Sequence, residues 1–243
     1  MPMDQTKPTD RQKRNWDLAF SKVQDFTIQR GVNSFINPFS LLRLGETENV
    51  VEGIDYLYVD GISLVQFIQL FLKKKVDRYS FDDTSVAPIV FNYVKEHKLR
   101  LAVVGTTQVN LEKSVGILEQ RYGFQVAYAR NGFFAGVQER RDVVQHLAKE
   151  NFDVVVCGMG TPLQETFLIE LKEAGWNGYG YTCGGYLHQL ATKEKYYPKI
   201  FDKLNIRWIY RIYDEPKLFH RYFVLYPKFA LEFMKYRMKT SSR

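Results

Sequence analysis

The sequence contains only two cysteines, Cys157 and Cys183, and each lies in a strongly apolar run. Such thiols are typically buried and free, so no disulfide framework is expected. Long apolar segments are also lacking: the charge-free stretch 61–72 falls far below the roughly 20 residues that span a bilayer. The first 14 residues are polar, with mixed charges, and resemble neither a secretory signal nor an anchor. These absences favour a cytoplasmic location.

Several common catalytic motifs are missing as well. A phosphate-binding G-x-x-x-x-G-K-[ST] loop is absent, and Gly158-Met159-Gly160 lacks the third glycine of a dinucleotide-binding fingerprint. The four histidines show no metal-ligand spacing, no D-x-D occurs, and there is no G-x-S-x-G elbow. The sequence therefore excludes a P-loop NTPase, disfavours an NAD enzyme, and predicts neither a cofactor nor a metal site.

The chain does have the composition of a folded globular protein with a basic end. Its 243 residues are 45% hydrophobic and 15% aromatic, which is enough for one sizeable core. The net charge is +7, and residues 193–243 alone carry thirteen lysines and arginines against five acids. This asymmetry predicts an anionic partner for the C-terminal end: lipid head groups, ligand phosphates or nucleic acid.

Short apolar runs alternate with segments of helical period between residues 30 and 190. The runs lack clean alternation and are followed by Gly or Asn, as is typical of strands buried on both faces. We therefore predict an α/β fold, a Rossmann-like parallel sheet covered by helices. The expected strands are Val32–Ile36, Tyr56–Val59, Leu99–Val104, Gln125–Tyr128, Val154–Cys157 and Gly178–Tyr181.

Ligands bind such sheets at the carboxyl ends of the strands, so the loops that follow the strands are candidate sites. Asp60 follows an apolar run and precedes Gly61. A carboxylate there suits a general base, but it also suits a simple cap of the helix expected over 62–73. Gln164 and Glu165 fall in a first helical turn, where they are either plain surface residues or ligands of sugar hydroxyls.

The basic end is predicted to form two helices within 216–239, broken at Pro227. The second helix would place Phe229, Phe233 and Tyr236 on one face, opposite Lys228, Glu232, Lys235 and Lys239. This pattern is typical of helices that lie in a membrane interface, and equally of a terminal helix docked on its own domain.

Four motifs together carry a resemblance to a known family. The run from Gly158 to Glu165 is similar to the G-x-G-x-P-x-Q-E signature of the WecG/TagA/CpsF glycosyltransferases. Asp60-Gly61 and Asn131-Gly132-Phe133 resemble two further family motifs, and residues 208–221 resemble its W-x-Y-R…E-P…R pattern. Where the family commonly has Thr-x-Asn, this chain has Phe35-Ile36-Asn37.

The resemblance implies an inverting, metal-independent glycosyltransferase for a bacterial surface polysaccharide or exopolysaccharide. It implies a UDP-sugar donor, for example UDP-N-acetylmannosamine, and a sugar acceptor linked to a polyprenyl pyrophosphate. Asp60 matches the proposed catalytic base and Gln164 an active-site glutamine. Substrate-binding roles are expected for Asn37, Arg78, Gly105, Thr106, Thr107, Asn131, Gly132, Gly158, Gly160, Pro162, Glu165, Arg207, Arg211 and Arg221.

The expected organisation is a flexible tail over 1–14, an α/β core over 15–195 and a membrane-associating appendage over 196–243. The enzyme would be peripheral on the cytoplasmic face of the cell membrane, and a homo-oligomer is left open. Two alternatives remain at this point: a binding module whose basic tail grips nucleic acid, and a Rossmann methyltransferase. The first lacks the signatures of RNA-binding folds, and its cations are interleaved with Phe and Leu.

Overall fold

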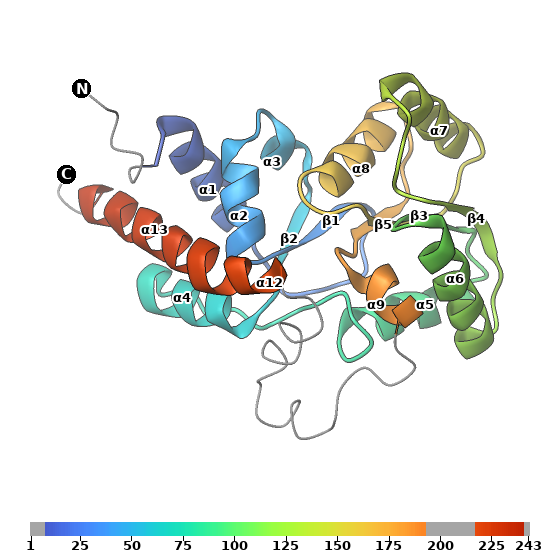
Figure 1. Cartoon of the computed structure of the whole chain (residues 1–243), viewed down its shortest axis with the longest axis horizontal. Coiled ribbons are helices and arrows are strands. Elements are labelled where there is room, and N and C mark those ends of the chain that lie inside the picture. Colours follow the sequence, from blue (N-terminus) through green and yellow to red (C-terminus); the bar gives the residue numbers. More distant parts are fainter. Residues whose placement is uncertain (1–7, 193–216, 241–243) are drawn as a thin grey trace.

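The computed structural model describes residues 8–192 and 217–240. Its centre is a six-stranded, entirely parallel sheet in the order β2-β1-β6-β5-β3-β4 (Figure 1). The strands are β1 (Gly31–Ile36), β2 (Tyr56–Val59), β3 (Leu101–Gly105), β4 (Val126–Arg130), β5 (Val154–Gly158) and β6 (Tyr179–Thr182). All six predicted strands are confirmed, with ends within two residues of those expected.

Helices connect the strands and cover both faces of the sheet. They are α1 (Asp10–Lys22), α2 (Pro38–Glu46), α3 (Val50–Gly53), α4 (Ile62–Leu72), α5 (Val86–Glu96), α6 (Gln108–Tyr122), α7 (Val137–Lys149), α8 (Leu163–Glu173) and α9 (Tyr186–Thr192). A C-terminal helical segment follows, built from α12 (Lys217–His220), the π-helix η1 (Arg221–Leu225) and α13 (Tyr226–Thr240). The expected α/β fold with a Rossmann-like sheet is therefore confirmed.

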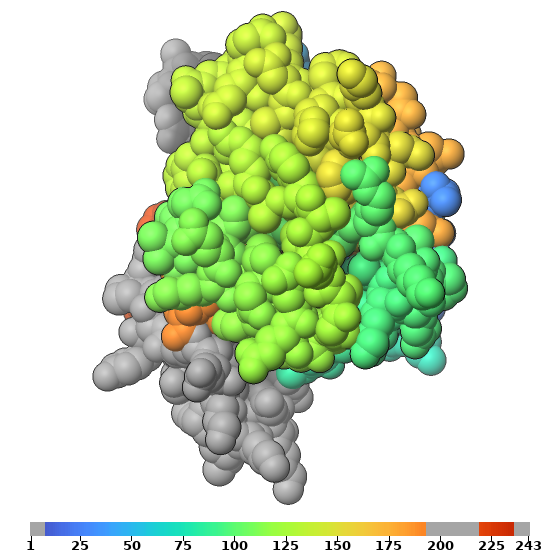
Figure 2. All heavy atoms as spheres, turned by 90° about the vertical axis from the view of Figure 1, so that its right-hand side faces the viewer, coloured from blue at the N-terminus to red at the C-terminus, as the bar shows by residue number. Residues whose placement is uncertain are grey.

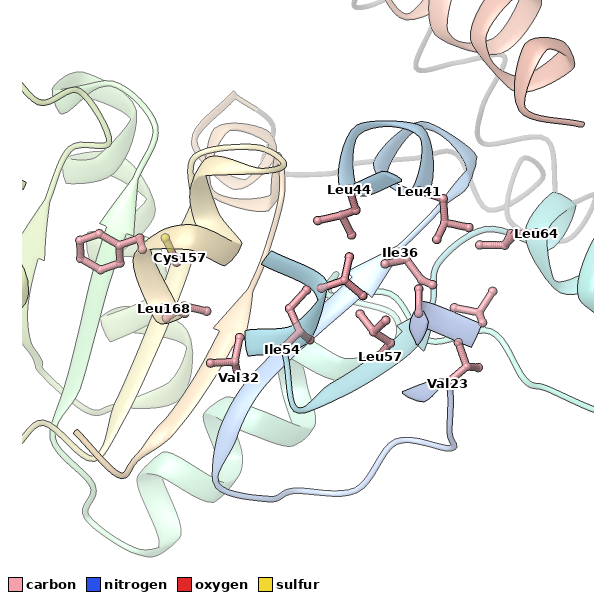
Figure 3. Close-up of a cluster of buried hydrophobic side chains, with 14 of the residues drawn as sticks. Val23, Val32, Ile36, Leu41, Leu44, Ile54, Leu57, Leu64, Cys157 and Leu168 are labelled. Carbon is pink, nitrogen blue, oxygen red and sulfur yellow. The ribbon is translucent and has the colours of Figure 1, made fainter. Parts of the chain in front are cut away.

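Two hydrophobic clusters form the core, one on each face of the sheet. Because side chains alternate along a strand, Val155 and Cys157 of β5 face one cluster, while Val154 and Val156 face the other. The first cluster joins the sheet to α1, α2, α3, α4, α7, α8 and α13, and part of it is drawn in Figure 3. The second joins the sheet to α5, α6 and α9. Strands buried on both faces explain why the sequence runs lacked polar alternation.

The N-terminal helix begins inside the segment that was expected to be a flexible tail. Thr9 and Gln12 form a capping box, with Gln12 N–H donating to the Thr9 hydroxyl at 3.2 Å and Thr9 N–H to the Gln12 side chain at 2.7 Å. Trp16 is fully buried, and its indole N–H donates to the carbonyl oxygen of Leu41 at 2.9 Å. Residues 10–14 thus belong to α1 and are not part of a flexible tail.

The C-terminal segment is helical through Pro227, where a break was expected. Proline lacks an N–H and its ring clashes with the carbonyl group four residues earlier in an α-helix. The chain accommodates this with the π-helical turn Arg221–Leu225, in which the N–H of Tyr226 bonds to the carbonyl oxygen of Arg221. The irregularity therefore precedes the proline, and the helix changes type instead of ending.

One face of α13 packs onto the core. Phe229 and Phe233 are 1% and 0% exposed, and their ring centroids lie 5.6 and 5.9 Å from that of Trp16. Glu232, expected on the polar face, is instead buried beside these rings, 3.6 Å from the ammonium group of Lys228. Of the two interpretations of this helix, docking on the domain is therefore correct for this face, and insertion into a membrane is wrong. The side chains of Tyr236 and Lys239 lie outside the described residues.

The helical segment 217–240 and the β4 edge occupy opposite ends of the molecule (Figure 1). The side nearest β4 is covered by α5, α6 and α7, coloured from blue-green to yellow-green in Figure 2. None of the helices within residues 8–192 and 217–240 is long and apolar enough to cross a membrane.

Candidate active site

A cavity of about 680 Å³ opens where the chain leaves β1, β2 and β6. Six segments of the chain form its wall. These are the start of α2, the loop after β2, the loop before α5, the start of α8, the loop after β6, and residues 221–226 of the C-terminal helical segment. The polar lining includes Asn37, Asp60, Arg78, Asp82, Asp83, Thr161, Gln164, Thr182 and Arg221. This is the edge at which parallel sheets bind ligands.

Asp60 lies at the end of β2, on the wall of this cavity. Its main-chain N–H donates to the carbonyl oxygen of Ile36 at 2.7 Å, which ties the ends of β1 and β2 together. The N-cap of α4 is Gly61, with φ of 96°, a conformation that glycine adopts without strain. Asp60 is therefore not the N-cap residue of that helix, and it lines the cavity.

Asn37 caps α2 and also lines the cavity. Its side-chain oxygen accepts hydrogen bonds from the main-chain N–H groups of Phe39 and Ser40, each at 3.1 Å. Because this oxygen is committed to the helix, only the amide nitrogen can serve a ligand. Both interpretations of Asn37, structural and ligand-binding, are compatible with this geometry.

Arg78 is held beside Asp60 by the loop that follows α4. The N–H of Tyr79 donates to the carbonyl oxygen of Val59 at 2.8 Å, so this loop runs next to the end of β2. The guanidinium group of Arg78 pairs with Asp82 at 3.1 Å. The other oxygen of Asp82 accepts bonds from the main chain and hydroxyl of Thr84, at 2.8 and 2.7 Å. A cation is thus positioned in the cavity by a carboxylate that is itself fixed.

A second acid of the same loop, Asp83, anchors it to the far wall. Its carboxylate pairs with Arg121 of α6 at 2.7 Å and accepts a hydrogen bond from the hydroxyl of Tyr186 at 2.7 Å. Burial and the nearby Asp83 raise the pKa of the Tyr186 hydroxyl above its ordinary value. Tyr186 therefore stays protonated and continues to donate this bond at neutral pH.

Gln164 and Glu165 form a buried polar cluster at the cavity wall. Glu165 is fully buried, and one of its oxygens accepts bonds from Ser34, Thr161 and the Gln164 amide at 2.9, 3.1 and 3.0 Å. The side-chain oxygen of Gln164 accepts a bond from the N–H of Gly184 at 3.1 Å. Burial raises the pKa of Glu165, although these donors oppose the shift. Gln164 lines the cavity, whereas Glu165 does not.

The appendage contributes one side of the cavity. Arg221, Tyr222, Phe223 and Tyr226 line it, and the guanidinium carbon of Arg221 lies 4.0 Å from the centre of the Phe39 ring. The C-terminal segment thus supplies a cation at the same cavity as Asp60. The predictions for Arg207 and Arg211 fall outside the described residues.

Several residues predicted to bind substrate do not line this cavity, and their role in binding stays a prediction. A Cβ atom on Gly105 would lie 2.5 Å from the carbonyl oxygen of Gly158, and one on Gly132 would lie 3.1 Å from Gly105 Cα. These glycines therefore allow backbones to pack closely. The N–H of Thr106 donates to Gly158 at 3.1 Å, so it is not available to a phosphate, and Thr107 caps α6. The remaining predicted residues outside the cavity lining are Asn131, Gly158, Pro162 and Glu165.

Other lining residues were missed by the sequence analysis. The loop Ser80–Thr84 carries two adjacent acids, and the turn Cys183–Gly185 follows β6, the one strand end that was not considered. The Gly184-Gly185 pair after an apolar run was the available signal for this turn. Cys183 is a buried, free thiol, as expected, and burial raises its pKa to about 12. No group of three or more His, Cys, Asp or Glu within residues 8–192 and 217–240 could hold a metal ion.

Comparison with known proteins gives the class of protein to which the chain belongs. Residues 12–243 match the family described as Glycosyl transferase WecG/TagA/CpsF family, which is most of the chain. The chain belongs to this family and is a glycosyltransferase. It is also 31% identical, over 205 residues, to the UDP-Gal:alpha-D-GlcNAc-diphosphoundecaprenol beta-1,4-galactosyltransferase of Shigella boydii. That alignment covers 84% of this chain and 86% of the relative, and it disfavours both the nucleic-acid-binding and methyltransferase alternatives.

Proposed function

We propose that the enzyme transfers a hexose from a UDP-sugar to a sugar that is linked through a diphosphate to a polyprenyl lipid. The observation that carries this proposal is the placement of Asp60, at the end of a strand, and of two arginines, Arg78 and Arg221, on the wall of a single cavity. A glycosyl transfer of this kind needs a base for the acceptor hydroxyl and positive charge for the departing diphosphate. The family membership and the relative's substrates support the same reaction.

The proposed step is a single displacement. Asp60 accepts the proton of the acceptor hydroxyl while that oxygen attacks the anomeric carbon of the donor sugar. The bond from this carbon to the UDP oxygen breaks, and UDP leaves with the electron pair. The relative's name gives a β-1,4 linkage, and nucleotide-activated galactose carries an α bond, so one displacement gives the inverted product. Inversion is therefore part of the proposal.

The negative charge on the leaving UDP is met by arginine. Arg78 is close enough to the end of β2 to act beside Asp60, and Arg221 enters from the appendage. Arginine suits phosphate because its planar group donates two parallel hydrogen bonds. The sequence lacks D-x-D, the motif with which many glycosyltransferases hold a divalent metal ion on the donor diphosphate. We therefore propose that transfer does not require a divalent metal ion.

The donor and acceptor are tested directly with purified full-length protein. We propose UDP-galactose as the first donor, with UDP-N-acetylmannosamine as the alternative, and an N-acetylglucosamine linked through diphosphate to a polyprenyl lipid as acceptor. The measurement is incorporation of labelled sugar into the lipid fraction. Incorporation from at least one UDP-sugar supports the proposal. Incorporation from none, with donor hydrolysis also absent, contradicts it.

We further propose that the appendage rests on an anionic membrane surface through its outward face. Phe219, Phe223, Val224 and Leu231 are each about half exposed, and they lie on the side of the helical segment opposite Phe229 and Phe233. The first two rings stack at 4.5 Å. These four side chains form what we call the outer stripe. Exposed apolar side chains on a basic helix are typical of interfacial binding.

Helix α4 extends this face. It packs against α13 through Phe67, whose ring centroid lies 4.8 Å from that of Phe233, and the two helices run side by side in Figure 1. Leu70 of α4 is 70% exposed, and the exposed cations Lys73 and Lys75 follow it. Each cation near an anionic leaflet contributes about 1 kcal/mol. Phe223 belongs to both the outer stripe and the cavity lining, so a lipid-linked acceptor would reach Asp60 from the membrane side.

A further inference from the structure

Glu165 places an ionisable carboxyl group at a fully buried position, where stability alone does not explain an acid. Its second oxygen, Oε2, is buried and has no hydrogen-bond partner among the described residues. Such a group costs stability, and an apolar or amide side chain of similar size would usually serve packing better. Burial raises the pKa of this carboxyl, in keeping with that cost. Glu165 therefore calls for an explanation other than stability.

The contacts of Glu165 are arranged in two rows. Thr161, Gln164 and Thr182 line the cavity, whereas Ser34 and Glu165 lie behind them. Thr182 donates to the hydroxyl of Ser34 at 3.2 Å, Ser34 donates to Glu165 at 2.9 Å, and Glu165 accepts from the front row. The carboxyl group is thus the common acceptor for β1 and the start of α8, and Ser34 links it to Thr182 of β6.

Two of these hydrogen bonds fix the orientation of the Gln164 amide. Only the oxygen of that amide can accept from the N–H of Gly184, and only its nitrogen can donate to Glu165. Both bonds exist together in one orientation of the amide alone. Gly184 has φ of 53° and sits in the turn Cys183–Gly185, which lines the cavity. Fixing Gln164 therefore fixes this turn.

We propose that Glu165 is a positioning residue, which acts on the cavity through Gln164 and thereby sets the turn at Gly184. Glu165 does not touch substrate. Only the expected loss of kcat rests on the proposed function. The orientation of Gln164 and the hydrogen bond to Gly184 are properties of the free protein.

The test compares Glu165→Ala, Glu165→Gln, Gln164→Ala and the double variant Glu165→Ala/Gln164→Ala. Glutamine keeps an oxygen acceptor for the three donors, so Glu165→Gln keeps kcat within about fivefold. Glu165→Ala lowers kcat by roughly 10- to 100-fold at temperatures where it is fully folded, as misplacement of a site element does. The double variant loses no more than Gln164→Ala alone, because both changes remove the same contact.

Glu170→Ala is the matched control. Glu170 lies on the same helix and pairs with Arg140 at 2.7 Å, away from the cavity. Glu170→Ala should lower the melting temperature without changing kcat. The positioning role is overturned if Glu165→Ala likewise changes only the melting temperature. It is also overturned if the fold loss of kcat in the double variant equals the product of the losses in the two single variants. Where Glu165→Ala fails to fold, Glu165→Leu, which refills the volume, takes its place.

Amide hydrogen exchange separates this inference from the proposed function. We expect the Gly184 N–H to be protected in the wild type and in Glu165→Gln, and to exchange at least tenfold faster in Glu165→Ala. This result is expected even if no UDP-sugar is turned over. Unchanged protection of Gly184 in the alanine variant would refute the positioning role, whatever the sugar-transfer assay shows.

Discussion

The guanidinium group of Arg221 lies over the Phe39 ring, 4.0 Å from its centre, and so bridges the appendage to the start of α2. Phe39 is two residues from Asn37, and all three side chains line the cavity. The C-terminal segment is therefore part of the site wall.

Replacing Arg221 tests this relationship. A charge-assisted hydrogen bond contributes about 1.5–3 kcal/mol, so Arg221→Ala should lower kcat/KM by roughly 10- to 100-fold. Arg43→Ala is the control, because Arg43 lies over the same ring at 5.6 Å but does not line the cavity. Steady-state kinetics with the UDP-sugar measure both. Equal losses in the two variants would assign Arg221 a packing role only.

Removal of divalent metal ions tests the assignment of charge stabilisation to arginine. Activity should survive dialysis against EDTA and should rise less than twofold when Mg²⁺ or Mn²⁺ is restored. The rate of sugar incorporation is measured before and after each treatment. Strict dependence on an added divalent ion would contradict this part of the mechanism.

The two faces of the appendage should respond differently to substitution. Phe219→Ser/Phe223→Ser changes the outer stripe and should reduce flotation with anionic vesicles at least tenfold, while the melting temperature stays nearly constant. Phe229→Ala opens a cavity beside Trp16 and should cost about 3–5 kcal/mol of stability. Flotation and thermal melting are measured on both proteins. Full vesicle binding by the Phe219/Phe223 variant would exclude the outer stripe as the membrane contact.

Glu232 makes stability depend on pH in a defined direction. Burial raises its pKa above the ordinary value of 4.5, against the opposing effect of Lys228 and Lys235 and with a further raising effect from Glu46. The folded state thus binds this proton more tightly than the unfolded state does. The associated stability is fully present below pH 4.5 and is lost as the pH rises through the raised pKa.

Glu232→Gln, which is neutral at every pH, should therefore raise the melting temperature relative to the wild type at pH 8. The difference should shrink toward pH 4.5, where the wild-type carboxyl group is protonated. Thermal melts of both proteins at several pH values between 4.5 and 8 supply the measurement. A difference that does not change with pH would show that Glu232 is ionised without cost in the folded protein.

The sheet could be predicted from the sequence because most of its strands are buried on both faces. Val154–Cys157 is apolar throughout, the other runs are mostly apolar, and each is followed by a glycine, an asparagine or a polar turn. The placement of Asp60 at a strand end followed from the same pattern. These signals are local, so they remain visible without knowledge of the tertiary contacts.

The errors arose where tertiary contacts decide the outcome. Helical periodicity put Glu232 on a polar face, but it cannot show that Phe229 and Phe233 dock on Trp16 and bury their neighbour. The substrate-binding role expected for Gly105 and Gly158 stays a prediction, because close packing between neighbouring strand ends also accounts for both glycines. The acids Asp82 and Asp83 reach the cavity through a loop with no periodic signal.

The most direct test of the account is the rate of sugar transfer by Asp60→Asn. If Asp60 is the base, the turnover number falls by roughly 10²–10⁴, while the affinity for UDP stays within a few-fold of the wild type. Asp55→Asn serves as control, because Asp55 precedes the opposite end of the same strand and pairs with Lys172 at 2.6 Å. Wild-type turnover by Asp60→Asn would contradict the central claim that this cavity, with Asp60 as base, is the active site.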